Sequence, residues 1–273
     1  MSTYINDYVP LRDRIGQIGF NKLGEKMEVI DCFPNSRVEV RFMDGKGCTV
    51  NTKYSTFLEG AVKNYNRICY GFRGYLGQGP YETIYKKDGK KINKPEFNVW
   101  NSMHKRAGNY SGEKPTYSDV TVCDEWCNYQ NFAKWYNENV YEVPGEKLCL
   151  DKDILYPGNK IYSPKTCRLV PDGINQLFKQ PPRKNNDLPI GVVKDSSYKT
   201  PKYRTIKLIE LDFYGNKHKF SKTCDTMEEA FMLYKYYHEK YVHDTAEIYK
   251  TYIPIEIYNA LKQYRFDLYN KII

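Results

Sequence analysis

The chain has 273 residues, 41% of them hydrophobic, which is enough to bury a core and to form two or three small domains. The formal net charge at pH 7 is +9, too small for a disordered polycation. Neither the first ten residues nor any later stretch has the apolar run of a signal peptide or a membrane span. We therefore expect a cytoplasmic protein with reduced cysteines and no membrane partner.

The positive charge is concentrated in one part of the chain. Residues 152–222 contain 15 of the 42 basic residues and 6 of the 33 acidic residues, so this segment alone carries a net charge of +9. One basic segment in an otherwise neutral chain predicts a polyanionic partner, with nucleic acid as the first choice. Lysines spread over solvated surfaces are the alternative explanation.

Residues 1–80 predict a small β module. Residues 27–31 and 38–42 alternate apolar and polar side chains, and Asp44-Gly45 predicts a hairpin turn toward a third strand at residues 48–50. A Tyr-x-x-Phe-x-x-Gly element follows at residues 54–60. This order of elements resembles the amino-terminal module of phage finger proteins, which implies a role in positioning the chain on DNA or on a partner.

The central part predicts helices before a hairpin. Val99, Trp100 and Met103 have helical spacing within residues 97–106, and Val122, Trp126 and Phe132 are expected core residues farther along. Residues 148–154 then predict a strand, Pro157-Gly158-Asn159 a turn, and residues 161–170 the return strand. Pro171 suits the first turn of a closing helix, where its missing N–H is harmless.

The hairpin and closing helix resemble the HNH (ββα-metal) nuclease finger of a phage branch of that family. The matching frame is Leu-Asp-x-Asp at 150–153, a Gly-Asn turn, Tyr-Ser-Pro-x-Thr-Cys at 162–167 and an Asn on the helix, preceded by Trp-x-x-Met-x-x-Arg at 100–106. The resemblance implies that Asp151 and Asn175 are the metal ligands, for Mg²⁺ or Mn²⁺, and that Lys152 stands where the family has its catalytic histidine.

A lysine is normally protonated at neutral pH, and an ammonium group cannot take a proton from water. The sequence therefore predicts that the finger fold is retained but that its catalytic base is lost. By resemblance, the catalytic positions are Asp151, Lys152 and Asn175. His104 is an alternative base, and a purely structural role for Asp151 and Asn175 stays open. A zinc site made of Cys123, Cys127, Cys149 and Cys167 is a less favoured alternative, because their spacing is poor for zinc.

The carboxy-terminal part predicts three strands, at residues 191–194, 203–209 and 217–220, followed by a helix. That helix begins with the capping box Thr226-x-x-Glu229 and continues with an apolar stripe that can cover the sheet. A terminal helical pattern from residue 253 is expected to pack on it.

This arrangement resembles the ethylene-response-factor (APETALA-type) DNA-binding domain, in which the exposed face of the sheet enters the major groove. Candidate DNA contacts by position are Lys194, Arg204, Lys207, Lys217 and Lys219. The basic linker at residues 179–187 adds Arg183 and Lys184 as minor-groove candidates.

Taken together, the sequence predicts an α+β fold with segments 1–80, 81–180 and 181–273. It favours a phage-type protein that binds double-stranded DNA, with no cofactor expected, over an enzyme. Two alternatives stay open: an HNH nicking endonuclease that uses Mg²⁺ or Mn²⁺, and an inhibitor that binds a protein of the host.

Overall fold

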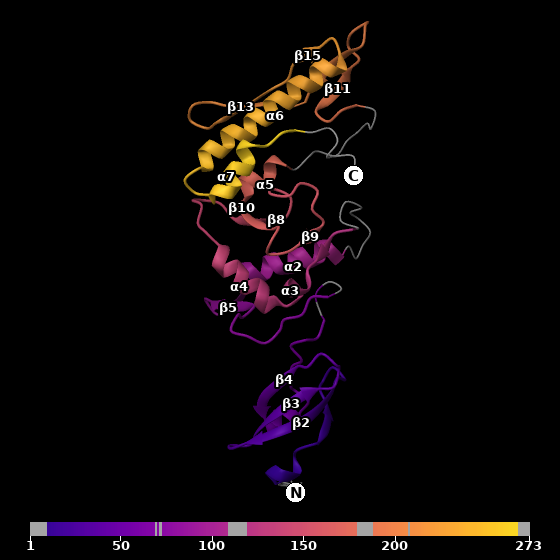
Figure 1. Cartoon of the computed structure of the whole chain (residues 1–273), viewed down its shortest axis with the longest axis vertical. Helices are drawn as coiled ribbons and strands as arrows, with labels where there is room; N and C mark the ends of the chain where they lie inside the picture. The colour runs from indigo at the N-terminus through magenta and orange to yellow at the C-terminus, as the bar shows by residue number, and fades with distance from the viewer. Residues whose placement is uncertain are drawn as a thin grey trace. The chain divides into compact units, whose positions relative to one another are not determined.

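The computed structural model describes residues 10–68, 70, 73–108, 119–178, 188–206 and 208–266. The chain divides into two compact units, Met1–Ser111 with Asp124–Lys134, and Gly112–Cys123 with Trp135–Ile273. Both contain helices and small sheets, which confirms the predicted α+β class (Figure 1).

The first unit begins with a four-stranded antiparallel sheet in the order β1-β2-β3-β4. Its elements are η1 (Leu11–Asp13), β1 (Ile18–Phe20), β2 (Lys26–Phe33), β3 (Arg37–Phe42), β4 (Thr49–Lys53) and α1 (Tyr54–Leu58). Alternate residues of β2 and β3 are buried, among them Met27, Val29, Val38 and Val40, as the period-two pattern predicts. These elements confirm the predicted strands and hairpin. Gly60, at the end of the predicted Tyr-x-x-Phe-x-x-Gly element, has a φ of 62°, and a Cβ there would lie 2.8 Å from the carbonyl oxygen of Phe20.

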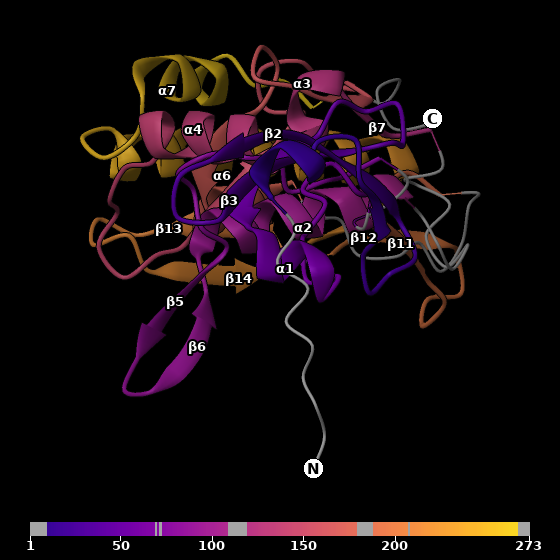
Figure 2. The same cartoon turned by 90° about the horizontal axis from the view of Figure 1, so that it is seen from below.

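The rest of the first unit is built around an aromatic core. Its elements are β5 (Ile84–Lys87), β6 (Lys90–Asn93), α2 (Pro95–Gly108), α3 (Asp124–Cys127) and the start of α4 (Tyr129–Asn139). Trp100, Trp126, Tyr129 and Phe132 are fully buried, and the Trp100 indole N–H donates to the Trp126 carbonyl at 2.7 Å. The helix predicted at residues 97–106 is confirmed, and β5–β6 forms a two-stranded ribbon (Figure 2).

The second unit contains the predicted finger, with corrections to its strands. Its elements are β7 (Thr121–Val122), β8 (Leu148–Asp151), β9 (Ile161–Tyr162), β10 (Arg168–Pro171) and α5 (Asp172–Leu177). The return strand is broken, because β9 pairs in parallel with β7 while β10 pairs antiparallel with β8. The break is a turn in which the Cys167 N–H donates to the Ser163 carbonyl at 3.0 Å. Pro171 ends β10 as the N-cap residue of α5 and is not its first helical residue.

The carboxy-terminal sheet consists of β11 (Val192–Asp195), β12 (Lys202–Thr205), β13 (Leu208–Leu211), β14 (Lys217–Phe220) and β15 (Thr223–Cys224). The strand predicted at 203–209 is divided in two. Arg204 pairs with Thr223 and Leu208 with Phe220, so one strand has an extra residue between these pairs, which is a β-bulge. The Thr205 hydroxyl accepts the Lys222 N–H there at 2.8 Å. The bulge therefore separates β11-β12-β15 from β13-β14.

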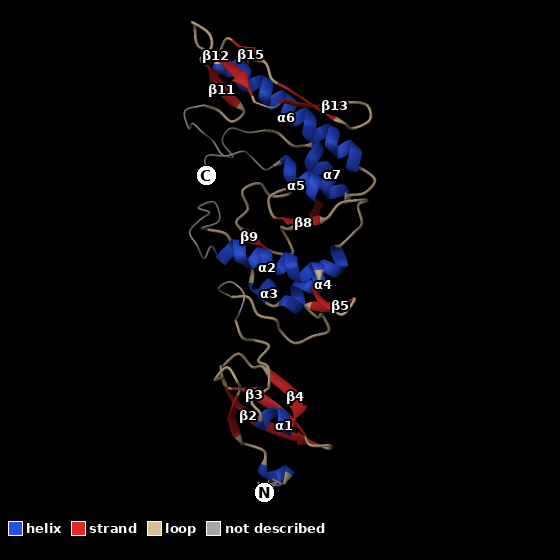
Figure 3. Cartoon of the chain, turned by 180° about the vertical axis from the view of Figure 1, so that it is seen from behind, coloured by secondary structure: helices blue, strands red, loops and turns tan. Residues whose placement is uncertain are grey.

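Two helices complete the second unit, α6 (Met227–Tyr249) along the sheet and α7 (Ile255–Lys262) (Figure 3). The predicted capping box is present, with the Glu229 N–H donating to the Thr226 hydroxyl at 3.1 Å. Val170 and Ile174 of the finger share a buried cluster with Val242 of α6. Segments 81–180 and 181–273 thus contribute to one core, and the division into three domains stays a prediction.

Candidate functional site

Asp151 closes β8 and organises the loop that follows. Its Oδ1 accepts the N–H groups of Asp153 at 2.8 Å and Ile154 at 2.7 Å. Because these bonds bend the chain, β8 ends at Asp151 and Ile154 is not part of the strand. Burial raises the pKa of the Asp151 carboxyl, although the two backbone hydrogen bonds oppose the shift. The residue matched to a metal ligand therefore has a local structural role.

Lys152 points into the same loop instead of toward solvent. It is 9% exposed, and its Nζ donates to the Asp153 carboxylate at 2.7 Å and to the Asn159 carbonyl at 2.6 Å. The Asn159 amide donates in turn to the carbonyls of Lys152 at 3.0 Å and Ile161 at 2.8 Å. An ammonium group has three donors and no lone pair with which to take a proton from water. The loop therefore holds Lys152 as a hydrogen-bond donor at the position where the resembling family has its base.

Asn175 lies on α5 and is partly exposed. In the part of the chain that the structure describes, no group of three or more His, Cys, Asp or Glu side chains could hold a metal ion. Asp151 and Asn175 are only two ligands, and one Asp151 oxygen already accepts two backbone N–H groups. Mg²⁺ or Mn²⁺ binding at these residues stays a prediction.

The alternative catalytic groups lie in packed surroundings. His104 is 3% exposed in the first unit, with its ring 4.6 Å from that of Trp100, and burial lowers its pKa. A histidine enclosed by aromatic rings is poorly placed to activate water. The described cysteines, including the four considered for zinc, form no disulfides with one another, and burial raises the pKa of Cys167 to about 12.

Arg204 is at the centre of the outer face of the β11-β12-β15 sheet. Its register partners are Val193 on one side and Thr223 on the other. The adjacent residue Tyr203 packs in the cluster that contains Phe231 of α6, so Arg204 points away from the helix. The Arg204 side chain is 53% exposed, and its Nε lies 3.9 Å from the Asp195 carboxylate. This pair is long and solvated, and the guanidinium can reach a ligand.

The other sheet candidates do not all share that face. Lys194 is paired with Tyr203, which places it on the opposite face at the edge strand β11. Lys217 lies 5.6 Å from the centre of the Tyr241 ring on α6, and Lys219 is exposed on β14. Lys207, Arg183 and Lys184 lie outside the described residues. Of the predicted DNA contacts, only Arg204 is therefore assigned by register to the outer face.

The sequence reasoning missed the tip of the β13–β14 hairpin. Phe213 is 96% exposed and Tyr214 is 85% exposed, the largest values for big hydrophobic side chains in the described chain. Asp212 supports the turn by accepting the N–H groups of Tyr214 at 2.9 Å and Asn216 at 2.8 Å. The available signal was two adjacent aromatic residues between an Asp and a Gly-Asn turn.

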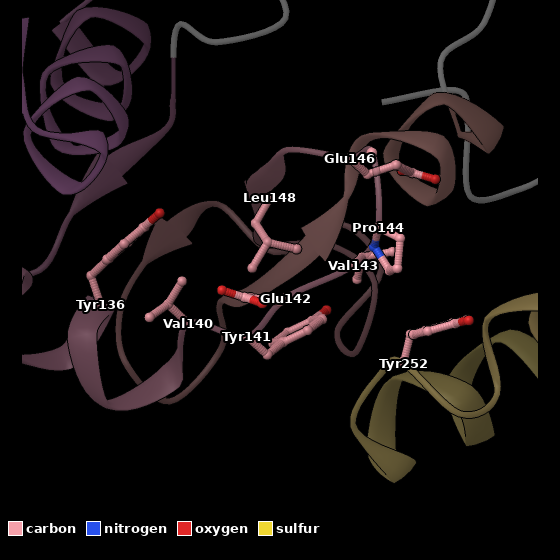
Figure 4. A pocket seen from close by; sticks show the side chains of 10 residues that line it. Tyr136, Val140, Tyr141, Glu142, Val143, Pro144, Glu146, Leu148 and Tyr252 are labelled. Carbon is pink, nitrogen blue, oxygen red and sulfur yellow. The ribbon is translucent and has the colours of Figure 1, made fainter.

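A shallow hollow of about 570 Å³ lies beside the loop between α4 and β8 (Figure 4). Five polar side chains line it: Tyr136, Tyr141, Glu142, Glu146 and Tyr252. Glu146 accepts the Gly173 N–H at 2.8 Å and a bond from the Tyr249 hydroxyl, while the Tyr141 hydroxyl donates to the Leu169 carbonyl at 2.8 Å. Glu146 and Tyr141 are therefore held by structural partners.

Comparison with known proteins gives no relative: no protein-family model, no curated protein and no solved structure matches the chain. Within the described residues, no helix has both the length and the apolar character needed to cross a membrane. The two family resemblances noted in the sequence thus stay predictions, and the function has to be argued from the site alone.

Proposed function

We propose that this protein binds double-stranded DNA through its carboxy-terminal sheet. The observation that carries the proposal is the distribution of ion pairs. Of the four carboxylates in the described residues between 188 and 225, three lie within 4.0 Å of a Lys or Arg side chain: Asp195, Glu210 and Asp225. The fourth, Asp212, lies 3.1 Å from His218, which is charged only when protonated. Four exposed lysines of this sheet have no ion-pair partner among the described residues: Lys194, Lys199, Lys219 and Lys222. The sheet therefore carries uncompensated positive charge.

Arg204 and the lysines would have different roles in such a complex. Arg204 on the outer face can bind a phosphate or the edge of a guanine, while the lysines mainly position the phosphate backbone.

The finger supports this sheet in the proposal and performs no chemistry. Its β10 and α5 contribute Val170 and Ile174 to the core beneath α6, and its loop is closed by Lys152. The nicking alternative requires a metal and a base that the described geometry does not assemble. Supercoiled plasmid with Mg²⁺ or Mn²⁺ tests it directly, since nicking that Asp151→Asn abolishes would overturn the non-enzymatic proposal.

The binding test is a titration of the full chain into a fluorescent duplex at several salt concentrations, read by anisotropy. We expect affinity to fall steeply with salt, because each neutralised phosphate contributes about 0.9 to the slope of log K against log salt. Combining Arg204→Ala, Lys219→Gln and Lys222→Gln should weaken binding and reduce that slope.

The matched control is Lys53→Gln. It removes one charge from an exposed lysine at the end of β4, in the other compact unit. We expect this variant to bind like the wild type. A binding curve that is independent of salt, or an equal loss in the control, would overturn the proposal.

A further inference from the structure

The β13–β14 hairpin ends in two aromatic side chains that are almost fully exposed among the residues that the structure describes. Phe213 and Tyr214 are 96% and 85% exposed, and their rings lie 5.5 Å apart at 84°. Keeping two rings in water is unfavourable, because each buried Å² of apolar surface is worth about 25 cal/mol. Surface of this kind, held at the end of a hairpin, marks a contact site.

The turn that presents the rings is well braced. Asp212 accepts the side-chain amide of Asn216 at 3.0 Å and lies 3.1 Å from the ring nitrogen of His218, in addition to its two bonds with backbone N–H groups. Gly215 has a φ of 81°, which a residue with a Cβ rarely adopts. The rings are therefore presented on a defined support, which lowers the entropy cost of binding.

The charges near the tip favour an anionic partner. Lys217 and Lys219 follow on β14, and Lys219 has no ion-pair partner among the described residues. Of the carboxylates near the tip, Glu210 is paired with Lys240 at 3.9 Å, whereas Asp212 contacts His218, which is charged only when protonated. The tip thus lies at the end of the β13–β14 hairpin, in the region proposed above to bind DNA.

We infer that Phe213 and Tyr214 stack on nucleobases that are unpaired or unstacked in the bound DNA. The inference rests on the proposed function and adds a substrate preference to it, for duplexes that contain a gap or a mismatch. Aromatic rings stack on any base without sequence preference, and bases that are already unpaired cost less to reach. The basic side chains extend along the strands away from the tip, which suits a linear polyanion better than insertion into a lipid surface.

The experiment compares a perfect duplex with the same duplex carrying a three-nucleotide gap that contains 2-aminopurine. The full chain is expected to bind the gapped duplex more tightly and to change the fluorescence of 2-aminopurine as a ring stacks on it. The double variant Phe213→Ala with Tyr214→Ala should lose this preference, by about tenfold in affinity for the gap, and should lose the fluorescence change. Its affinity for the perfect duplex and its salt slope should change little.

The matched control is Tyr236→Ala. Tyr236 is 59% exposed on α6 and pairs with Tyr237 at 5.2 Å and 85°, so this variant removes an exposed ring from a similar pair elsewhere in the same unit. The control should keep both the gap preference and the fluorescence change. Urea denaturation of each variant verifies that it is folded.

The two proposals fail in different ways. Salt-dependent binding to the perfect duplex, with a gap preference that the double variant retains, would overturn the inference and leave the proposed function intact. If the wild-type chain binds no duplex at all, both the proposed function and the inference are overturned. Sedimentation with phosphatidylserine vesicles that depends on Phe213 and Tyr214, without a gap preference, would assign the tip to lipid and also overturn the inference.

Discussion

Two turns of the second unit are each held by an Asp carboxylate that accepts two backbone N–H groups, but they direct their neighbouring side chains differently. In the finger loop Asp151 accepts two backbone N–H groups, and in the β13–β14 hairpin Asp212 does the same. The first turn directs a lysine inward, where Lys152 binds the loop's own carbonyl and carboxylate. The second directs two aromatic rings outward. A turn whose polar groups are satisfied internally stabilises the fold, whereas a turn that exposes apolar rings is available for binding.

The largest effect on stability is expected from Asp151→Ala. The N–H groups of Asp153 and Ile154 would lose their acceptor. The Ile154 N–H is partly buried, and such a donor without a partner costs about 1–3 kcal/mol, while the exposed Asp153 N–H loses a bond worth about 0.5–1.5 kcal/mol. We expect the free energy of unfolding to fall by about 2–4 kcal/mol in urea denaturation. Asp151→Asn is the control, because its amide oxygen can still accept both bonds. An equal loss in the Asn variant would contradict the structural role assigned to the carboxylate.

Lys152→Met should have the next largest effect. The substitution keeps much of the side-chain volume but leaves the Asn159 carbonyl and the Asp153 carboxylate without their donor. Because Asp153 is about half exposed, water compensates in part, and we expect a loss of about 1–3 kcal/mol. Urea denaturation measures it. A variant as stable as the wild type would show that the loop does not need the cation.

The pH dependence of stability should have opposite signs for the two aspartates. Burial raises the pKa of Asp151, so its favourable contribution is present below the unfolded value of 3.8 and is lost as pH rises through the folded pKa. The side-chain and backbone hydrogen bonds of Asn216 lower the pKa of Asp212. The stabilising contribution of Asp212 is therefore present above 3.8 and is lost as pH falls through the folded pKa.

Unfolding free energies measured from pH 2 to pH 6 check both signs. Asp151→Asn should remove the part of the wild-type curve that declines with rising pH above 3.8. Asp212→Asn should remove the part that declines with falling pH below 3.8. If both substitutions changed the pH dependence of the unfolding free energy in the same direction, the assigned causes would be contradicted. Those causes are burial for the raised pKa of Asp151 and hydrogen bonds for the lowered pKa of Asp212.

The local parts of this fold could be predicted from the sequence. Alternation places Val29 and Val38 in a buried sheet, and Thr226-x-x-Glu229 marks the start of α6. These signals depend on neighbours within a few residues. The broken return strand of the finger could not be predicted, because β9 takes a partner, Thr121–Val122, that lies far away in the sequence.

The candidate site shows the same limit. The faces on which Lys194 and Arg204 lie depend on the register between β11 and β12, which one strand does not specify. The bulge near Thr205 shifts the register again. The sequence placed Lys152 only by resemblance, at the position of the family's catalytic histidine. Its inward position depends on the carboxylate and the carbonyl of its own loop, and no sequence pattern indicated those contacts.

The smallest effect on stability should come from the tip itself. Phe213 and Tyr214 are almost fully exposed, so replacing both with Ala removes little buried surface, and the Asp212 bonds to backbone N–H groups are kept. We expect the free energy of unfolding to stay within about 0.5 kcal/mol of the wild type in urea denaturation. A larger loss would show that the rings pack against the protein in solution. If the tip contributes nothing to folding, substitution of its two rings tests the proposed base stacking without a change in stability.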